Sequence, residues 1–217
     1  MATVPRSSNE IHQSGRKPPP PGPLTEEEFL DWCDEDTKAE WVDGKVVLMS
    51  PANVQHALLS GFFYRVLSDF VDHHRLGTAF NSDLMIRLKD GRLRIPDLSF
   101  LTNQGMAMLS EKLCDGAPEL LAEIVSPDSK HRDWHDKYAE YEAEGVAEYW
   151  IVDPLEDRLA AFTLRDGKRY SPIAEKDGKI ASIVVRGFYL RPAWLFGDEI
   201  AKVADVLKEL TVGHTGG

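Results

Sequence analysis

Three side chains could carry out chemistry, because each has a type that is unusual for its place in the sequence. Asp97 lies within the otherwise apolar segment 94–101, Glu123 lies inside the apolar run 120–125, and Lys137 follows on a segment with helical spacing. A carboxylate in a buried strand costs free energy unless it is paired or bound to a metal. Two such carboxylates can hold Mg²⁺ through oxygen ligands, and a nearby ammonium can orient water or neutralise a phosphate. The set predicts metal-assisted hydrolysis of a phosphodiester, in which the metal lowers the pKa of a bound water.

Each of these residues also has an ordinary structural interpretation. Asp97 could be a turn residue or a hydrogen-bonded polar side chain. Lys137 could be a boundary lysine whose ammonium stays in solvent. Glu123 is harder to explain in this way, because it stands in the middle of its apolar run.

Other catalytic patterns are weaker. His131 and His135 have the i, i+4 spacing of a zinc-binding helix, but the glutamate of zinc proteases and a third ligand are missing. Ser126 has no Gly-x-Ser-x-Gly context, and the chain contains no Gly-x-x-x-x-Gly-Lys phosphate loop. The two cysteines, Cys33 and Cys114, form no CxxC pair, so we expect reduced thiols rather than a disulfide framework.

The charge of the chain limits how it could bind nucleic acid. It has 25 basic and 36 acidic side chains and a formal net charge of −11. This excludes a protein that coats DNA through bulk positive charge. It does not exclude a metal-dependent nuclease, whose site must concentrate carboxylates. Four basic residues could contact a DNA backbone: Arg92, Arg94, Lys130 and Arg132. The alternative for each is an ordinary solvated charge in a loop.

Length and composition predict one folded domain. The chain has 217 residues, of which 42% are hydrophobic, enough for a single core. Residues 1–23 hold six of the 13 prolines and are expected to form a disordered leader, and 212–217 a frayed tail. The domain is therefore expected to span 24–211. With no apolar run of about 18 residues and no signal-peptide core, we expect no membrane span and a cytoplasmic protein.

Local signals predict the elements that position the candidate residues. Thr25 and Glu28 form a capping box for a helix over 26–33, and Asp43-Gly44 predicts the turn of a hairpin over 40–49. An apolar stripe predicts a long helix over 53–75, with Gly77 as its stop signal. Strands are expected at 83–88 and 94–101, joined by a turn at 89–91, and an irregular connection at 102–118.

The second half of the sequence predicts a strand–helix–strand unit. The strands are 119–125 and 147–152, the helix is 129–144, and a right-handed crossover would make the strands parallel. An antiparallel strand at 158–164 and a final helix at 198–210 follow. The pattern is typical of one α/β domain with helices on the faces of the sheet.

Several motifs together resemble a known family. They are Glu40-Trp41-Val42-Asp43-Gly44, Met49-Ser50-Pro51, His56, Pro96-Asp97, Glu123-Ile124-Val125-Ser126-Pro127, Asp133, Lys137-Tyr138 and the run from Gly145 to Pro154. On these motifs, residues 24–197 resemble the Uma-two family of restriction endonucleases, in the PD-(D/E)xK nuclease superfamily. The resemblance implies a restriction-endonuclease-like fold, a mixed central β-sheet flanked by helices.

The resemblance also implies roles for individual residues. Asp97 becomes the motif aspartate and Glu123 the second carboxylate. The superfamily pattern places a lysine two residues after this glutamate, where the present chain has Val125. Lys137, supplied from the following helix, is the natural substitute. Glu40 is the candidate third acidic ligand, with a solvent-facing strand residue as the alternative.

The expected activity is that of a Mg²⁺-dependent DNA endonuclease, with Mn²⁺ as an alternative ion. His56 would contact phosphate or support the metal ligands, or would be a boundary histidine. A homodimer is one way in which the protein could cut both strands of a DNA duplex. The main alternative is a catalytically inactive nuclease-fold module that acts in binding or assembly. A small-molecule hydrolase is a third hypothesis, supported only by the acidic surface.

Overall fold

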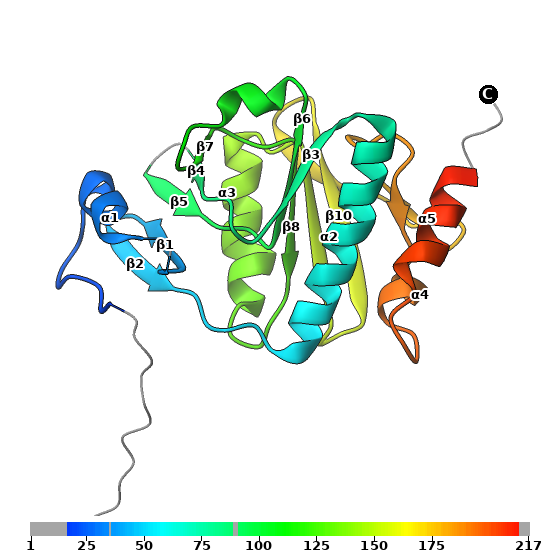
Figure 1. Ribbon diagram of the computed structural model, residues 1–217, viewed down its shortest axis with the longest axis horizontal. Helices are drawn as coiled ribbons and strands as arrows, with labels where there is room; N and C mark the ends of the chain where they lie inside the picture. Colours follow the sequence, from blue (N-terminus) through cyan, green and yellow to red (C-terminus); the bar gives the residue numbers. More distant parts are fainter. Residues whose placement is uncertain (1–16, 35, 89–90, 213–217) are drawn as a thin grey trace, which may run out of the picture.

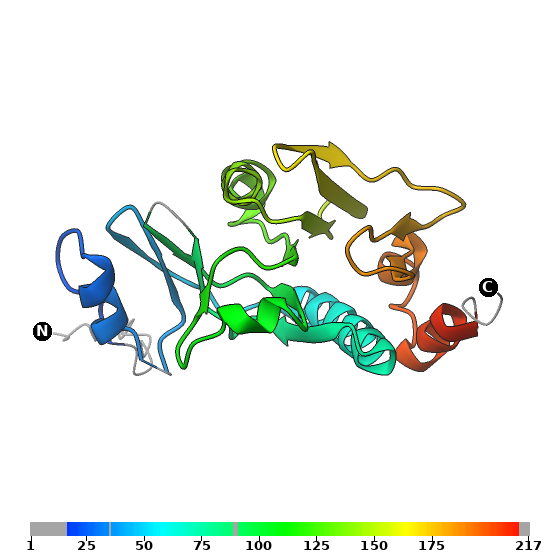
Figure 2. The same ribbon diagram turned by 90° about the horizontal axis from the view of Figure 1, so that it is seen from above.

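The computed structural model describes residues 17–34, 36–88 and 91–212. The predicted leader before residue 17, two residues of the turn at 89–91 and nearly all of the tail at 212–217 lie outside the described residues. At the centre is a six-stranded mixed sheet in the order β11-β10-β9-β8-β6-β3. The long helix α2 covers one face of this sheet and α3 covers the other (Figures 1 and 2). This arrangement is the predicted mixed sheet flanked by helices.

The bounds of the elements are as follows. The six-stranded sheet consists of β3 (Gly77–Asn81), β6 (Leu98–Thr102), β8 (Leu120–Ile124), β9 (Glu148–Asp153), β10 (Arg158–Arg165) and β11 (Arg169–Pro172). A five-stranded sheet contains β2 (Lys45–Leu48), β1 (Ala39–Val42), β5 (Arg92–Arg94), β4 (Ile86–Leu88) and β7 (Cys114–Asp115), and a small ribbon pairs β12 (Ile180–Ala181) with β13 (Tyr189–Leu190). The helices are α1 (Glu26–Trp32), α2 (Val54–His74), α3 (Lys137–Glu144), α4 (Pro192–Leu195) and α5 (Val203–Val212).

The strand–helix–strand unit is confirmed. β8 and β9 run parallel, whereas β8 and β6 run antiparallel. Side chains of β8 alternate between the two faces of the sheet. Leu120 and Ala122 pack in the core beneath α2, whereas Leu121 packs in the core beneath α3. Glu123 therefore projects toward α3, the helix that carries Lys137.

The predicted strand at 94–101 is wrong in one respect, because it divides into two strands of different sheets. β5 ends at Arg94 and belongs to the five-stranded sheet, and β6 begins at Leu98 in the six-stranded sheet. Pro96 lies in the break, where its missing N–H cannot contribute to a ladder of hydrogen bonds. Asp97 thus lies at the junction of the two sheets.

The predicted hairpin and the first two helices are confirmed, with changed boundaries. The side chain of Thr25 accepts a hydrogen bond from the Glu28 N–H, and the Glu28 side chain bonds back to Thr25. The long helix ends at His74, one residue from the predicted end at 75, and its C-cap is Arg75 in the left-handed conformation rather than the predicted stop signal Gly77. Gly77 instead begins β3, a strand that the sequence analysis did not predict. A Cβ atom at Gly77 would lie 2.0 Å from the carbonyl oxygen of Leu101, so the close pairing requires glycine here.

Two later helices differ from the prediction. The helix expected from 129 contains a π-helical turn, Arg132–Asp136, before α3 begins at Lys137. In this turn the Lys137 N–H donates to the carbonyl of Arg132, five residues earlier. The last helix begins at Val203 rather than at 198, because α4 and an irregular segment precede it. None of the described helices has the length and apolar character needed to cross a membrane.

Candidate active site

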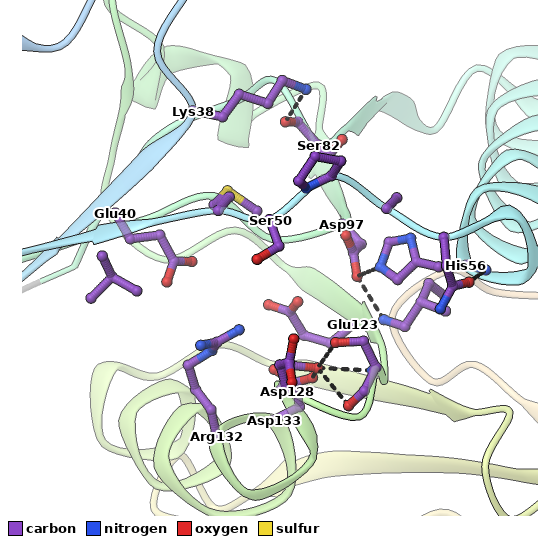
Figure 3. A pocket seen from close by; sticks show the side chains of 18 of the residues that line it. Lys38, Glu40, Ser50, His56, Ser82, Asp97, Glu123, Asp128, Arg132 and Asp133 are labelled. Carbon is purple, nitrogen blue, oxygen red and sulfur yellow. Dashed lines mark hydrogen bonds and ion pairs between the residues drawn. The ribbon is translucent and has the colours of Figure 1, made fainter. Parts of the chain in front are cut away.

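A cavity of about 580 Å³ lies where the two sheets meet (Figure 3). Its lining includes all five residues selected from the sequence, which are Glu40, His56, Asp97, Glu123 and Lys137. The structure therefore brings together side chains from β1, α2, the junction before β6, β8 and α3. Asp133, which belongs to the family motifs but was not predicted as a site residue, also lines the cavity.

Asp97 is held in place through one of its two carboxylate oxygens. Its Oδ2 accepts a hydrogen bond of 2.7 Å from the backbone N–H of Ile124 and lies 3.1 Å from His56 Nε2. No hydrogen bond to Oδ1 is found among the described residues. The side chain is buried at the junction of the two sheets. One oxygen of Asp97 is thus fixed by the protein, and the other makes no hydrogen bond in the described structure.

Glu123 is held in the same way. Its Oε1 accepts hydrogen bonds from Lys137 Nζ at 2.7 Å and from the Tyr141 hydroxyl at 2.9 Å. Within the described part of the chain, Oε2 makes no hydrogen bond. Burial raises the pKa of Glu123 to about 8; the charge of Lys137 works against this rise, and neighbouring carboxylates, first Asp133, add to it.

The Lys137 ammonium lies among carboxylates. Besides its 2.7 Å contact with Glu123, Nζ lies 3.4 Å from Glu40 Oε1 and 3.8 Å from Asp133 Oδ1. Burial by itself lowers the pKa of Lys137, but the charges of Glu123, Glu40 and Asp133 outweigh it and raise the pKa above its ordinary value. Lys137 is therefore a fixed positive charge at neutral pH.

Glu40 differs from the other carboxylates because both of its oxygens have partners. Oε2 accepts a hydrogen bond of 2.8 Å from Arg94 Nη1, and Oε1 accepts one of 3.2 Å from the Ile95 N–H. Burial works against the charged form, but Lys137 and Arg94 together lower the pKa of Glu40. A metal bound by Glu40 would therefore share its carboxylate oxygens with Arg94 and the Ile95 N–H.

Arg94 is a buried structural cation rather than a surface contact for DNA, so that expectation is wrong for this residue. Its side chain is 3% exposed. Nε and Nη2 bind the two oxygens of Glu140 at 2.9 and 2.7 Å, and Nη1 binds Glu40. The bidentate geometry, which suits a guanidinium paired with a carboxylate, ties β5 to α3.

Asp133 is a buried carboxylate of the cavity that was not predicted as a site residue. It is 1% exposed, and its Oδ2 accepts a hydrogen bond from the Ser129 hydroxyl. Its Oδ1 is buried without a hydrogen-bond partner in the described structure. Burial raises the pKa of Asp133, although Lys137 and the Ser129 hydrogen bond oppose the rise.

The donor atoms fit a hard divalent cation. Asp97, Glu123 and Asp133 each have one oxygen held by the protein and one without a hydrogen bond in the described structure. Mg²⁺ is commonly bound through one or two carboxylates, with water and substrate phosphate completing its shell. Within residues 17–34, 36–88 and 91–212, no three Asp, Glu, His or Cys side chains are arranged to hold an ion directly. The arrangement therefore fits an ion bound by two carboxylates and water better than one enclosed by protein ligands.

Comparison with known proteins identifies the family. A family described as "Putative restriction endonuclease" and named Uma2 matches residues 26–192. The chain belongs to the Uma2 family. This confirms the family that the sequence motifs indicated, and the match includes all five selected residues of the cavity together with Asp133.

A solved structure has the same fold as this Uma2 chain. It is the crystal structure of "a putative nuclease belonging to DUF820" from Anabaena variabilis, which is 20% identical and has a TM-score of 0.67. The match covers 80% of the present chain and 98% of the other. At this identity the likeness shows the fold, and it confirms the restriction-endonuclease-like architecture. A comparison with curated proteins found no match.

His56 is expected to make the stability of this Uma2 domain depend on pH. Burial lowers the pKa of His56, but the hydrogen bond and charge of Asp97, with a contribution from Asp133, raise it above 6.5 overall. The pairing therefore stabilises the fold fully below pH 6.5, and this contribution is lost as the pH rises through the raised pKa of the folded state. Urea unfolding should show that His56→Gln loses more stability at pH 6 than at pH 8.5. An equal loss at both pH values would contradict the assignment.

Proposed function

We propose that this chain is a Mg²⁺-dependent endonuclease that hydrolyses phosphodiester bonds of DNA. One observation carries the proposal: Asp97, Glu123 and Lys137 line the same cavity, and each of the two carboxylates has an oxygen without a hydrogen bond in the described structure. The register of the antiparallel pair places Leu98 beside Ala122, so position 97 lies next to position 123. The family description and the shared fold support this reading.

In the proposed reaction, Asp97, directly before β6, and Glu123, in β8, would hold the cation. The bound cation supplies a Lewis acid that lowers the pKa of a water and stabilises charge on the phosphate. The oxygen of the water forms a bond to phosphorus while the bond from phosphorus to the leaving oxygen breaks. The attacking water gives up one proton to solvent and the leaving oxygen takes one up, so the overall reaction consumes one water and breaks one phosphodiester bond.

Lys137 supplies the fixed positive charge beside the reacting phosphate. A buried ammonium is worth more to a developing negative charge than a solvated one, because the local dielectric is low. Glu40 helps to set its position, since Glu40 Oε1 lies 3.4 Å from the Lys137 ammonium and Glu40 is itself held by Arg94. Lys137 thereby takes the role that the superfamily pattern gives to the position of Val125.

The charges around the cavity are consistent with nucleic-acid binding that depends on the cation. Lys38 and Arg132 line the cavity on opposite walls (Figure 3). The chain as a whole carries a charge of −11 and repels a polyanion. A cation at Asp97 and Glu123 would offset the negative charge at the point where the phosphate must approach. A homodimer would present two such sites to a duplex.

The test is whether nicking of supercoiled plasmid depends on a divalent cation. Purified protein is expected to convert the plasmid to open circles with Mg²⁺ or Mn²⁺. Excess EDTA should reduce the rate to background, because the carboxylates alone cannot activate water, and added Mg²⁺ should restore it. Cleavage that persists in EDTA would contradict the cation-dependent reaction. An intact plasmid under all these conditions would favour the inactive binding module.

A further inference from the structure

Asp133 is the buried carboxylate for which the reaction proposed above has no use. Asp133 lines the cavity, its buried Oδ1 lacks a hydrogen bond in the described structure, and the nearest cation is Lys137 Nζ at 3.8 Å. A buried carboxylate oxygen without a hydrogen bond destabilises the folded protein. The fold therefore tolerates a cost at this position.

Hydrogen bonds hold the rest of Asp133 in place. The Ser129 hydroxyl donates to Oδ2, and the Ser126 N–H donates to the Ser129 oxygen at 2.9 Å. The Tyr149 hydroxyl donates to the main-chain oxygen of Asp133 at 2.9 Å. Hydrogen bonds thus hold both Oδ2 and the backbone of Asp133, and Oδ1 is the side-chain oxygen left without one in the described structure.

The local backbone supports a role beyond packing. Asp133 lies in the π-helical turn Arg132–Asp136, and such turns inside α-helices are frequent at functional sites. The turn places Asp133 one helical turn before Lys137, on the same side of the helix. Since no three acidic side chains of the described residues are arranged to enclose an ion, a cation on Asp97 and Glu123 would reach Asp133 through water.

We propose that Asp133 is a further carboxylate of the cation site, whose Oδ1 accepts a hydrogen bond from a water bound to the ion. The inference rests on the proposed function, because it assumes a cation held by Asp97 and Glu123. Mg²⁺ retains several of its waters when it binds to proteins, and groups that bond to such ligands set their orientation. Asp133 would fix one water of the ion's shell relative to the phosphate.

The test is a calorimetric titration of the full chain with Mn²⁺, which requires no cleavage. Asp133→Asn keeps the volume and a partner for Ser129 but removes the charge that faces the ion. Loss of an outer partner of this kind typically weakens metal binding by about 10- to 100-fold, and we expect a loss in that range. Asp136→Asn, on the same helix with a 54% exposed side chain, is the matched control and should bind Mn²⁺ as the wild type does.

The outcomes separate this inference from the proposed function. Equal Mn²⁺ affinity of wild type and Asp133→Asn overturns the inference and leaves the proposed function standing. A wild-type chain that binds no Mn²⁺ overturns both. Thermal unfolding without cation adds a second readout: Asp133→Asn should melt at or above the wild-type temperature, because it relieves a buried charge. A lower melting temperature would assign Asp133 to the fold and overturn the inference.

Discussion

Glu123→Gln is expected to lower the rate of plasmid nicking by at least about a thousandfold, because metal stabilisation of the reaction is worth several kcal/mol and each 1.4 kcal/mol is tenfold. The substitution retains the volume of the side chain and an acceptor for Lys137 and Tyr141. It removes the charge that would hold the cation beside Asp97. Initial rates at saturating Mg²⁺ measure the effect.

The pH dependence of the stability of the same variant separates a lost site from a lost fold. Because the pKa of Glu123 is raised from 4.5 to about 8 by burial, its ionisation costs the wild type stability as the pH rises through this interval. Glu123→Gln should therefore gain in stability relative to the wild type between pH 5 and pH 8. Glu156→Gln, an exposed change, is the control. Cleavage by Glu123→Gln within about tenfold of the wild type, well short of the expected loss, would refute its role.

Lys137→Met is expected to lower the free energy of unfolding by about 3–5 kcal/mol, the usual cost of removing one partner of a buried ion pair. The ammonium contacts Glu123 and Glu40, and both carboxylates would remain buried without it. Nicking should also be lost, because the positive charge beside the phosphate is gone. Urea unfolding measures the first effect, and plasmid nicking at a temperature where the variant is folded measures the second.

Two variants control for the effect of Lys137. Lys130→Met removes an exposed lysine near the start of the same helix and should change stability by less than about 0.5 kcal/mol. Adding Glu123→Gln to Lys137→Met should recover part of the lost stability, because one unpaired carboxylate is then neutral. A loss below about 1 kcal/mol for Lys137→Met would show that its contacts contribute no more than surface ion pairs do.

The sequence was informative where a residue conflicts with its surroundings. Glu123 stands out because a charged side chain interrupts a buried strand, and Asp97 because it follows proline in an apolar segment. Such conflicts can be seen without any knowledge of the fold. The capping box at Thr25 and the hairpin turn at Asp43-Gly44 are likewise local signals, and the structure contains both.

Features that depend on distant contacts could not be predicted in this way. Glu40 and Arg94 pair across 54 positions of sequence, so neither the pairing nor the burial of Arg94 has a local signal. Asp133 lies between Arg132 and Trp134, where an aspartate is typical of a solvated helix face. Its burial follows from the π-helical turn and from Tyr149, which packs from β9. The break at Pro96 could be suspected, but that it separates two sheets could not.

The most direct test of the central claim is the initial rate of plasmid nicking by the wild-type chain in Mg²⁺, measured beside Asp97→Asn prepared in the same way. Asp97→Asn keeps the shape of the side chain and an acceptor for the Ile124 N–H. We expect nicking by the wild type and a rate at background for the variant. Equal rates for the two proteins, or no nicking by either with Mg²⁺ or Mn²⁺, would contradict it.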